Sequence, residues 1–266
     1  MTAKSAFVWR DALRLLSVRL VLEQLGLVLG VFVLFVVWLR LPDVSALEVA
    51  GSGLFAMLIV AAAGLGETRI VLSIAGRAST WGRLLRGASL LVVAAVIWFA
   101  WNHWLTHLSG PDATRAGYFN SRAPHQLRYL LTYGHILLWL GWMWSTLGWI
   151  GAGVITVFAF ALTASTRPMR AALLALRSLS FWLVLLIGST AGVLVTGVLM
   201  GWTPLHGLRL ELLSLGCRVA IASLFDATIA CWLLSILAAC VRRADASYSK
   251  VDGGPDESQP RTVGNP

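Results

Sequence analysis

The chain has 266 residues, of which 58% are hydrophobic and 12% charged, and its formal net charge is +9. An ordinary soluble domain has about 45–50% apolar and about 25% charged residues, so this composition excludes a large soluble enzyme domain and is typical of a membrane protein. The basic residues flank long apolar runs. They therefore favour the anionic headgroups of a lipid bilayer as a partner and exclude nucleic acid.

Six apolar stretches are long enough to cross a hydrocarbon core of about 30 Å as helices. In chain order they are 19–40, 46–66, 87–108, 136–163, 178–201 and 212–240. The first is too long for a signal peptide and is expected to remain as a membrane helix. We predict an all-α fold, a polytopic membrane helix bundle of six transmembrane helices. Residues 19–243 form its transmembrane domain, 1–18 a cytoplasmic segment and 244–266 a disordered cytoplasmic tail.

The distribution of basic residues predicts the orientation. Of the 21 lysines and arginines, all but six fall on one side of the predicted spans. The six exceptions are Arg40, Arg115, Arg122, Arg128, Arg209 and Arg218. The positive-inside rule therefore predicts that both termini are cytoplasmic.

Small residues four apart predict close contacts between membrane helices. Such pairs are Gly26 with Gly30, Gly188 with Gly192, and Gly197 with Gly201. Together they favour a compact bundle.

Two related stretches precede predicted spans. "ASTWGRLLRGASLL" (78–91) leads into the third span and "ASTRPMRAALLALRSL" (164–179) into the fifth. In each, a Ser/Thr pair suited to N-capping precedes arginines and an apolar helix, which predicts three helical hairpins joined by two basic connections. In this layout the chain resembles uncharacterised bacterial multi-pass inner-membrane proteins related to the membrane domain of glycerophosphodiester phosphodiesterases. The resemblance implies a bacterial inner membrane, and it transfers no functional residue.

The stretch "WFAWNHWLTHL" (98–108) allows two interpretations. His103 and His107 share one helical face, and His135 begins the fourth span at a similar depth, so the three histidines are a minor alternative as haem, pigment or metal ligands. Tryptophans on the third and fourth spans instead favour an aromatic belt without a cofactor. They are Trp98, Trp101, Trp104, Trp139, Trp142 and Trp149. Trp149 should lie deeper, as a packing residue or in a lipid- or pigment-facing groove.

The three cysteines, Cys217, Cys231 and Cys240, all lie in the last apolar segment without a Cys-x-x-Cys spacing. This arrangement predicts neither a metal site nor a disulfide framework.

Ionisable residues within spans are candidate functional sites because charges are costly in a bilayer. Glu23 lies near the cytoplasmic interface, where Arg19, one turn earlier, can pair with it. Asp226 is expected in the outer part of the core, and Arg218 should reach the outer headgroups. Asp226 and Arg218 are about 12 Å apart along the helix, so Asp226 needs a partner on another helix, a proton or water. No ionisable residue is expected at the midplane, which disfavours a coupled transporter with a central charged site.

The sequence contains no motif that is typical of a particular enzymatic reaction. We therefore expect a non-catalytic integral membrane component, either a scaffold subunit or a permease-like bundle, working with other membrane subunits. The alternative is a lipid-handling transporter or intramembrane enzyme, whose tryptophan-lined outer half and basic connections would hold a lipid. Replacing Asp226 by Asn is expected to impair function without preventing membrane insertion.

Overall fold

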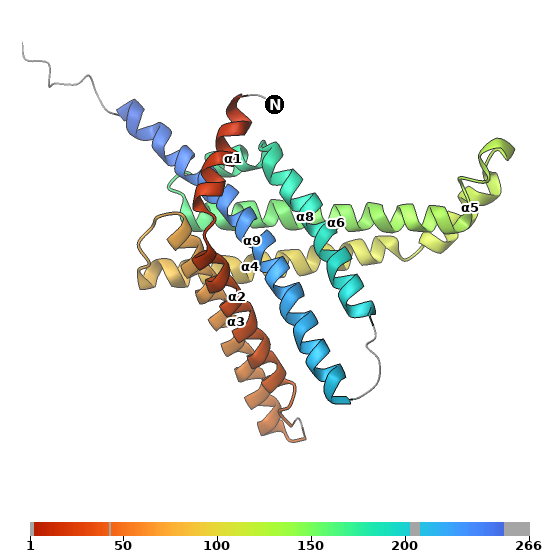
Figure 1. The fold of residues 1–266 in the computed structure, drawn as a ribbon, viewed down its shortest axis with the longest axis horizontal. Helices are drawn as coiled ribbons and strands as arrows, with labels where there is room; N and C mark the ends of the chain where they lie inside the picture. Colours follow the sequence, from red (N-terminus) through yellow and green to blue (C-terminus); the bar gives the residue numbers. More distant parts are fainter. Residues whose placement is uncertain (1–2, 43, 203–207, 253–266) are drawn as a thin grey trace, which may run out of the picture.

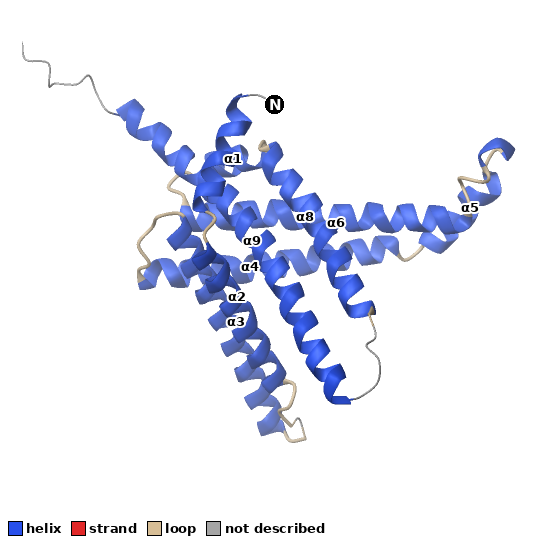
Figure 2. Cartoon of the chain, viewed as in Figure 1, coloured by secondary structure: helices blue, strands red, loops and turns tan. Residues whose placement is uncertain are grey.

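A computed structural model describes residues 3–42, 44–202 and 208–252, and in this part of the chain it contains helices and loops but no strand (Figure 2). Six of these helices are long and apolar enough to cross a membrane. They are α2 (Val18–Trp38), α3 (Ala46–Ile74), α4 (Trp81–Ser109), α6 (Tyr133–Ala164), α8 (Leu179–Gly201) and α9 (Leu208–Asp252). The prediction of an all-α protein with six apolar helices of membrane-spanning length is confirmed.

Side-chain caps explain where several long helices begin. The Ser17 hydroxyl accepts a hydrogen bond from the Leu20 amide at the start of α2, and Thr132 caps α6 in the same way. At the start of α3, Ser45 and Glu48 form a reciprocal capping box. Each cap satisfies amide groups that the first turn of a helix leaves without an acceptor.

Helix α3 is longer than the sequence predicted, because it continues from residue 66 to Ile74. Glu67, Thr68 and Arg69 lower the hydropathy at this point, but all three are compatible with a helix. The buried Thr68 hydroxyl donates to the Gly64 carbonyl one turn earlier, so it needs no partner outside the helix. Glu67 therefore lies within α3 rather than beyond its end.

The remaining elements are short. They are α1 (Ala3–Leu15), α5 (Asp112–Arg122), a 3-10 turn η1 (His125–Leu127) and α7 (Pro168–Leu176). Helix α1 packs on α9, α7 packs against α6 and α9, and α5 packs on α6. Asp112 fixes α5, since it accepts a hydrogen bond from Trp144 Nε1 at 2.6 Å and pairs with Arg115 at 2.8 Å.

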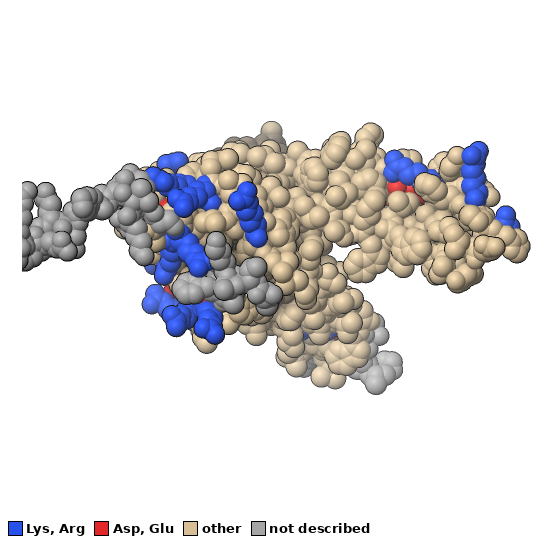
Figure 3. Space-filling model, turned by 90° about the horizontal axis from the view of Figure 1, so that it is seen from above, with Lys and Arg blue, Asp and Glu red and all other residues tan. Residues whose placement is uncertain are grey.

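The long helices form three consecutive pairs, α2 with α3, α4 with α6, and α8 with α9, and α3 packs on α4 as extensively as it packs on α2. Figure 1 shows the pairs converging near α1 and α7 and diverging from there, with α4 and α6 running on to α5. Lysines and arginines gather where the pairs converge, and a smaller group lies at the α5 tip, with an uncharged band between them (Figure 3). We call the convergent end the basic end.

The packed core lies at the basic end. Its buried side chains come from α1, α2, α3, α6, α7, α8 and α9, and the most enclosed include Phe181, Ile236 and Leu237. Away from this end, large apolar side chains such as Phe32, Met57 and Val198 are exposed. Lipid-facing surface in a membrane is apolar in the same way, so the diverging pairs need no polar covering.

The glycine pairs differ in what they contact. Gly188 packs against Ile229, and Gly192 faces Asp226, so this pair does mark the predicted contact face between α8 and α9. A Cβ placed at Gly26 or Gly30 would have no described neighbour within 4 Å, and the predicted contact at this pair is therefore wrong. A Cβ placed at Gly197 or Gly201 would likewise have no described neighbour within 4 Å. Close packing is thus confined to the basic end and to parts of each helix pair, and the bundle is less compact than expected.

Helix α9 continues to Asp252, which corrects the expected start of a disordered tail at 244; residues 253–266 lie outside the described part. A polar cluster holds this extension. Asp245 accepts hydrogen bonds from Ser165 Oγ at 3.0 Å and Thr166 Oγ1 at 2.7 Å, and it forms an ion pair with Arg77. We call Arg77, Ser165, Thr166 and Asp245 the Asp245 latch, because they tie the α3–α4 and α6–α7 connections to α9.

Candidate functional site

Two hollows lie along helices α4 and α6. The smaller has a volume of about 300 Å³ and is bounded by α3, α4, α6 and α9; we call it the Glu67 hollow. The larger, of about 730 Å³, lies between α4, α6 and α8, and we call it the tryptophan groove. Trp98 lines both, so the two hollows meet at this side chain. Both volumes fall within the range of about 300–1,000 Å³ that is usual for small-molecule sites.

Small residues make room for the Glu67 hollow. Ala94 and Ala95 face it from α4, and Ala152 and Ala159 face it from α6, where larger side chains would fill the space. The rest of the lining is mostly apolar. The other lining residues are Glu67, Val71, Leu91, Trp98, Ile155, Thr156, Phe160, Thr163 and Leu234.

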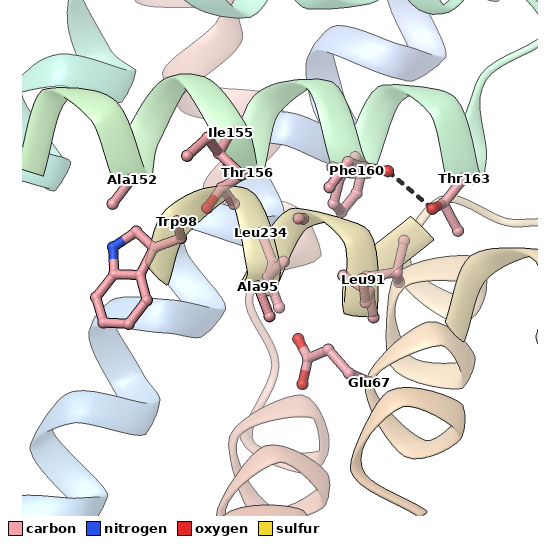
Figure 4. Close-up of a pocket in the computed structure, with 13 residues that line it drawn as sticks. Glu67, Leu91, Ala95, Trp98, Ala152, Ile155, Thr156, Phe160, Thr163 and Leu234 are labelled. Carbon is pink, nitrogen blue, oxygen red and sulfur yellow. Dashed lines mark hydrogen bonds between the residues drawn. The ribbon is translucent and has the colours of Figure 1, made fainter. Parts of the chain in front are cut away.

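Glu67 is the only charged residue in this lining, and Figure 4 shows its carboxylate pointing into the hollow beneath Leu91 and Ala95. Gln24 on α2 donates a hydrogen bond from Nε2 to Glu67 Oε2 at 2.9 Å. No lysine, arginine or histidine pairs with Glu67 in the described ranges. A carboxylate withdrawn from water without a cation costs several kcal/mol, about the penalty for one desolvated ion. Glu67 is therefore suited to accept a cation or a strong hydrogen-bond donor from the hollow.

Gln24 on α2 helps to position the Glu67 carboxylate through this hydrogen bond. Its side chain is only 7% exposed, and its Oε1 is buried without a hydrogen-bond partner among the described residues. Cys231 on α9 is fully buried and close enough to Glu67 to interact with it electrostatically. Three helices thus bring one glutamate, one glutamine and one thiol together beside the packed core, and the glutamate alone of the three reaches a hollow.

The sequence analysis missed Glu67 because the predicted second span ended at 66. A signal was present, since Ile70, Val71 and Ile74 continue a helical apolar face beyond the interruption. Glu67 lies seven residues before the end of α3, which is about 10 Å along the helix axis. It is therefore an additional carboxylate within a helix of membrane-spanning length, positioned toward the basic end.

The tryptophan groove is lined by Trp98, Trp142, Trp144 and Trp149 together with small and polar residues. Its polar side chains are mostly satisfied within their own helices. Asn102 donates to the Trp98 carbonyl at 2.8 Å, and Thr146 and Thr190 donate to carbonyls one turn earlier. The groove therefore presents mainly aromatic and aliphatic surface. Its remaining hydrogen-bonding groups include the indole N–H groups of Trp98, Trp142 and Trp149, which make no hydrogen bond with a described residue.

The tryptophans of the third and fourth predicted spans have different roles. Trp98, Trp142 and Trp149 line the groove, and Trp149 is 37% exposed, which matches the groove alternative rather than full packing. Trp101 instead packs over Gly151 and donates to the Leu147 carbonyl at 3.3 Å, joining α4 to α6.

The histidines of the haem and metal alternative lie outside both hollows. His103 and His107 are exposed, while His135 contacts the Leu130 carbonyl at 3.2 Å and stacks on Trp139. Within the described ranges, no group of three or more His, Cys, Asp or Glu side chains could hold a metal ion.

The other candidate residues have local partners or none. Glu23 forms the predicted ion pair with Arg19, with Oε1 and Nε 2.8 Å apart at an exposed position. The buried guanidinium of Arg218 donates hydrogen bonds to the carbonyls of Leu199 and Trp202 at the end of α8. Asp226 is exposed beside Gly192, makes no hydrogen bond or ion pair with a described residue and lines neither hollow.

No protein-family model matches the chain, and comparisons with curated proteins and with solved structures also gave no match.

Proposed function

We propose that this chain is a non-catalytic integral membrane protein that holds a lipid-like molecule with a long apolar chain against α4, α6 and α8. The observation that carries this proposal is the tryptophan groove and its junction with the Glu67 hollow at Trp98. The lining of the two hollows extends along α6 from Leu137 to Thr163, which is about 39 Å by helical rise. The path is therefore longer than the hydrocarbon core of about 30 Å.

The physical basis is shape rather than hydrophobicity. Lipid tails are as apolar as a leucine, so moving a chain from the bilayer into an apolar groove gains little by desolvation. Rigid indole rings offer a fixed, complementary surface and lose little conformational freedom on binding. A groove that is mainly aromatic and aliphatic favours a hydrocarbon chain over a sugar or a peptide.

The orientation is part of the same proposal. Three helical hairpins would place the basic end and both termini in the cytoplasm of a bacterial inner membrane, as the positive-inside rule requires. The arginines of the basic end would then contact anionic headgroups. The end of the tryptophan groove formed by Leu137 and Ser109 would lie toward the opposite leaflet.

A scaffold subunit of a membrane complex is the second candidate function. It is supported by the diverging helix pairs, because α2 and α3 expose large apolar side chains away from the basic end. Such faces could bind lipid or the helices of other subunits.

Native mass spectrometry of the protein extracted in a mild detergent separates the two functions. We expect the protein to retain one bound lipid that carries a hydrocarbon chain. The double variant Trp142→Ala/Trp149→Ala should lose this lipid. Trp139→Ala is the matched control, because Trp139 lies on the same helix, is 51% exposed and does not line the groove. Co-purifying polypeptides without retained lipid would favour the scaffold and contradict lipid binding.

A further inference from the structure

We infer that the molecule held in the tryptophan groove carries a protonated amine, and that this head enters the Glu67 hollow beside the Glu67 carboxylate. The inference rests on the proposed lipid-binding function and specifies the chemical class of its ligand. It would give the ligand a direction, with the head toward the basic end and the chain passing Trp98 into the groove.

The charge of the hollow selects the head. Among the described residues that line the hollow, Glu67 supplies the one ionisable side chain, and none is basic. The neighbouring side chains from α2 and α9 are the neutral Gln24 and Cys231. An anionic head such as a phosphate would be repelled here, whereas an ammonium group would supply the missing cation and up to three hydrogen-bond donors.

The polar partners of Glu67 favour the same class. Gln24 donates its hydrogen bond to Oε2 of the carboxylate alone, so Oε1 is available to a donor in the hollow. A charge-assisted bond from an ammonium is roughly twice as strong as a bond between neutral groups. A hydroxyl head could donate to the same oxygen, but it would leave the negative charge uncompensated.

Aromatic rings line the same hollow as this carboxylate. Trp98 and Phe160 both contribute to the lining, and ring faces attract cations that have lost part of their hydration. Carboxylate and aromatic surface together suit an organic cation attached to a hydrocarbon. The hollow volume of about 300 Å³ accommodates a small head and the first part of one chain, while the tryptophan groove takes the remainder.

The test compares ligands that differ only in their heads. The full chain, purified in a nonionic detergent at pH 7, is titrated with dodecylamine, dodecan-1-ol and dodecanoic acid, and bound ligand is counted by native mass spectrometry. Ethylamine serves as the chainless amine. We expect dodecylamine to bind about 10- to 100-fold more tightly than dodecan-1-ol, as a charge-assisted bond predicts, and dodecanoic acid to bind least.

The variants assign that preference to Glu67. Glu67→Gln should remove the preference for the amine and leave binding of the alcohol unchanged. Glu23→Gln is the matched control, since Glu23 makes an exposed ion pair and lines neither hollow, and it should keep the full preference. If Glu67→Gln does not fold, Thr156→Trp replaces an exposed lining residue with a side chain that fills the hollow. This variant should lose the amine preference while retaining Glu67.

The outcomes separate the two proposals. If the amine and alcohol bind alike and neither variant changes this, the amine inference is overturned while lipid binding stands. If none of the dodecyl compounds binds, the proposed function itself fails. Binding of ethylamine as tight as that of dodecylamine would support the amine site and overturn the role of the chain.

Discussion

Removing the Asp245 carboxylate should destabilise the whole basic end. Asp245 receives two hydroxyl hydrogen bonds, at 3.0 Å from Ser165 and 2.7 Å from Thr166, and an ion pair from Arg77. Hydrogen bonds to a charged group contribute about 1.5–3 kcal/mol each. The side chains of Arg77 and Asp245 are 32% and 19% exposed, so the ion pair is discounted toward the surface value of about 0–1 kcal/mol. We expect Asp245→Ala to lower the free energy of unfolding by about 3 kcal/mol.

The assay is reversible unfolding in mixed micelles of a nonionic detergent and increasing SDS. Asp11→Ala provides the control, because Asp11 makes no hydrogen bond or ion pair with a described residue, and it should change the free energy by less than about 0.5 kcal/mol. Thr166→Val alone should lower the free energy of unfolding by about 1.5 kcal/mol. The same substitution should have almost no effect in a protein that already carries Asp245→Ala. Equal effects of Asp245→Ala and Asp11→Ala, or full additivity of the Thr166 and Asp245 substitutions, would refute the latch.

Two further substitutions test contacts between helices. Gly87→Ala would drive a Cβ into Thr68 and to 2.9 Å from Thr163, so it should destabilise the protein by about 1–3 kcal/mol, whereas Gly82→Ala, which faces open space, should be neutral. The same SDS titration measures both, and a neutral Gly87→Ala would contradict the close α3–α4–α6 contact. Arg218→Met should lower the free energy of unfolding by about 2–3 kcal/mol, because the guanidinium donates hydrogen bonds to carbonyls at the end of α8. Faster hydrogen exchange in the last turn of α8 should accompany it, and unchanged exchange would exclude this capping role.

Local features of the fold were accessible from the sequence. The length of the apolar stretches predicts the six helices, and the spacing of Ser45 and Glu48 is typical of a capping box. The Arg19–Glu23 ion pair follows from a separation of four residues in a helix. Each of these depends on residues that are close in the chain, so the pattern determines the contact.

The candidate site depends on contacts that no local pattern contains. Glu67 was assigned to a connection because three polar residues interrupt the hydropathy, although α3 continues past them. Its partner Gln24 is 43 positions earlier, on another helix. Asp245 falls in a stretch with the composition of a tail, yet its partners are about 80 and 168 positions away. Only the packing of α2, α3, α6 and α9 brings these residues together.

Glycine spacing was informative only where a second helix was present. Gly188 and Gly192 face α9, while Gly26 and Gly30 face open space, although both pairs have the same spacing. The reason is that α2 and α3 diverge from the other pairs away from the basic end. A small-residue pattern therefore shows where a close approach is sterically allowed, and the arrangement of whole helix pairs decides whether it occurs.

Photochemical crosslinking tests the central claim, a lipid chain in the tryptophan groove, most directly. A dodecylamine with a diazirine near the chain end would be added to the purified protein, irradiated, and its attachment sites mapped by peptide mass spectrometry. The groove predicts attachment within 98–109, 137–149 and 186–194, and loss of that labelling in Trp142→Ala/Trp149→Ala. Labelling spread evenly over the exposed apolar faces of α2 and α3, unchanged in the double variant, would contradict a lipid-binding groove.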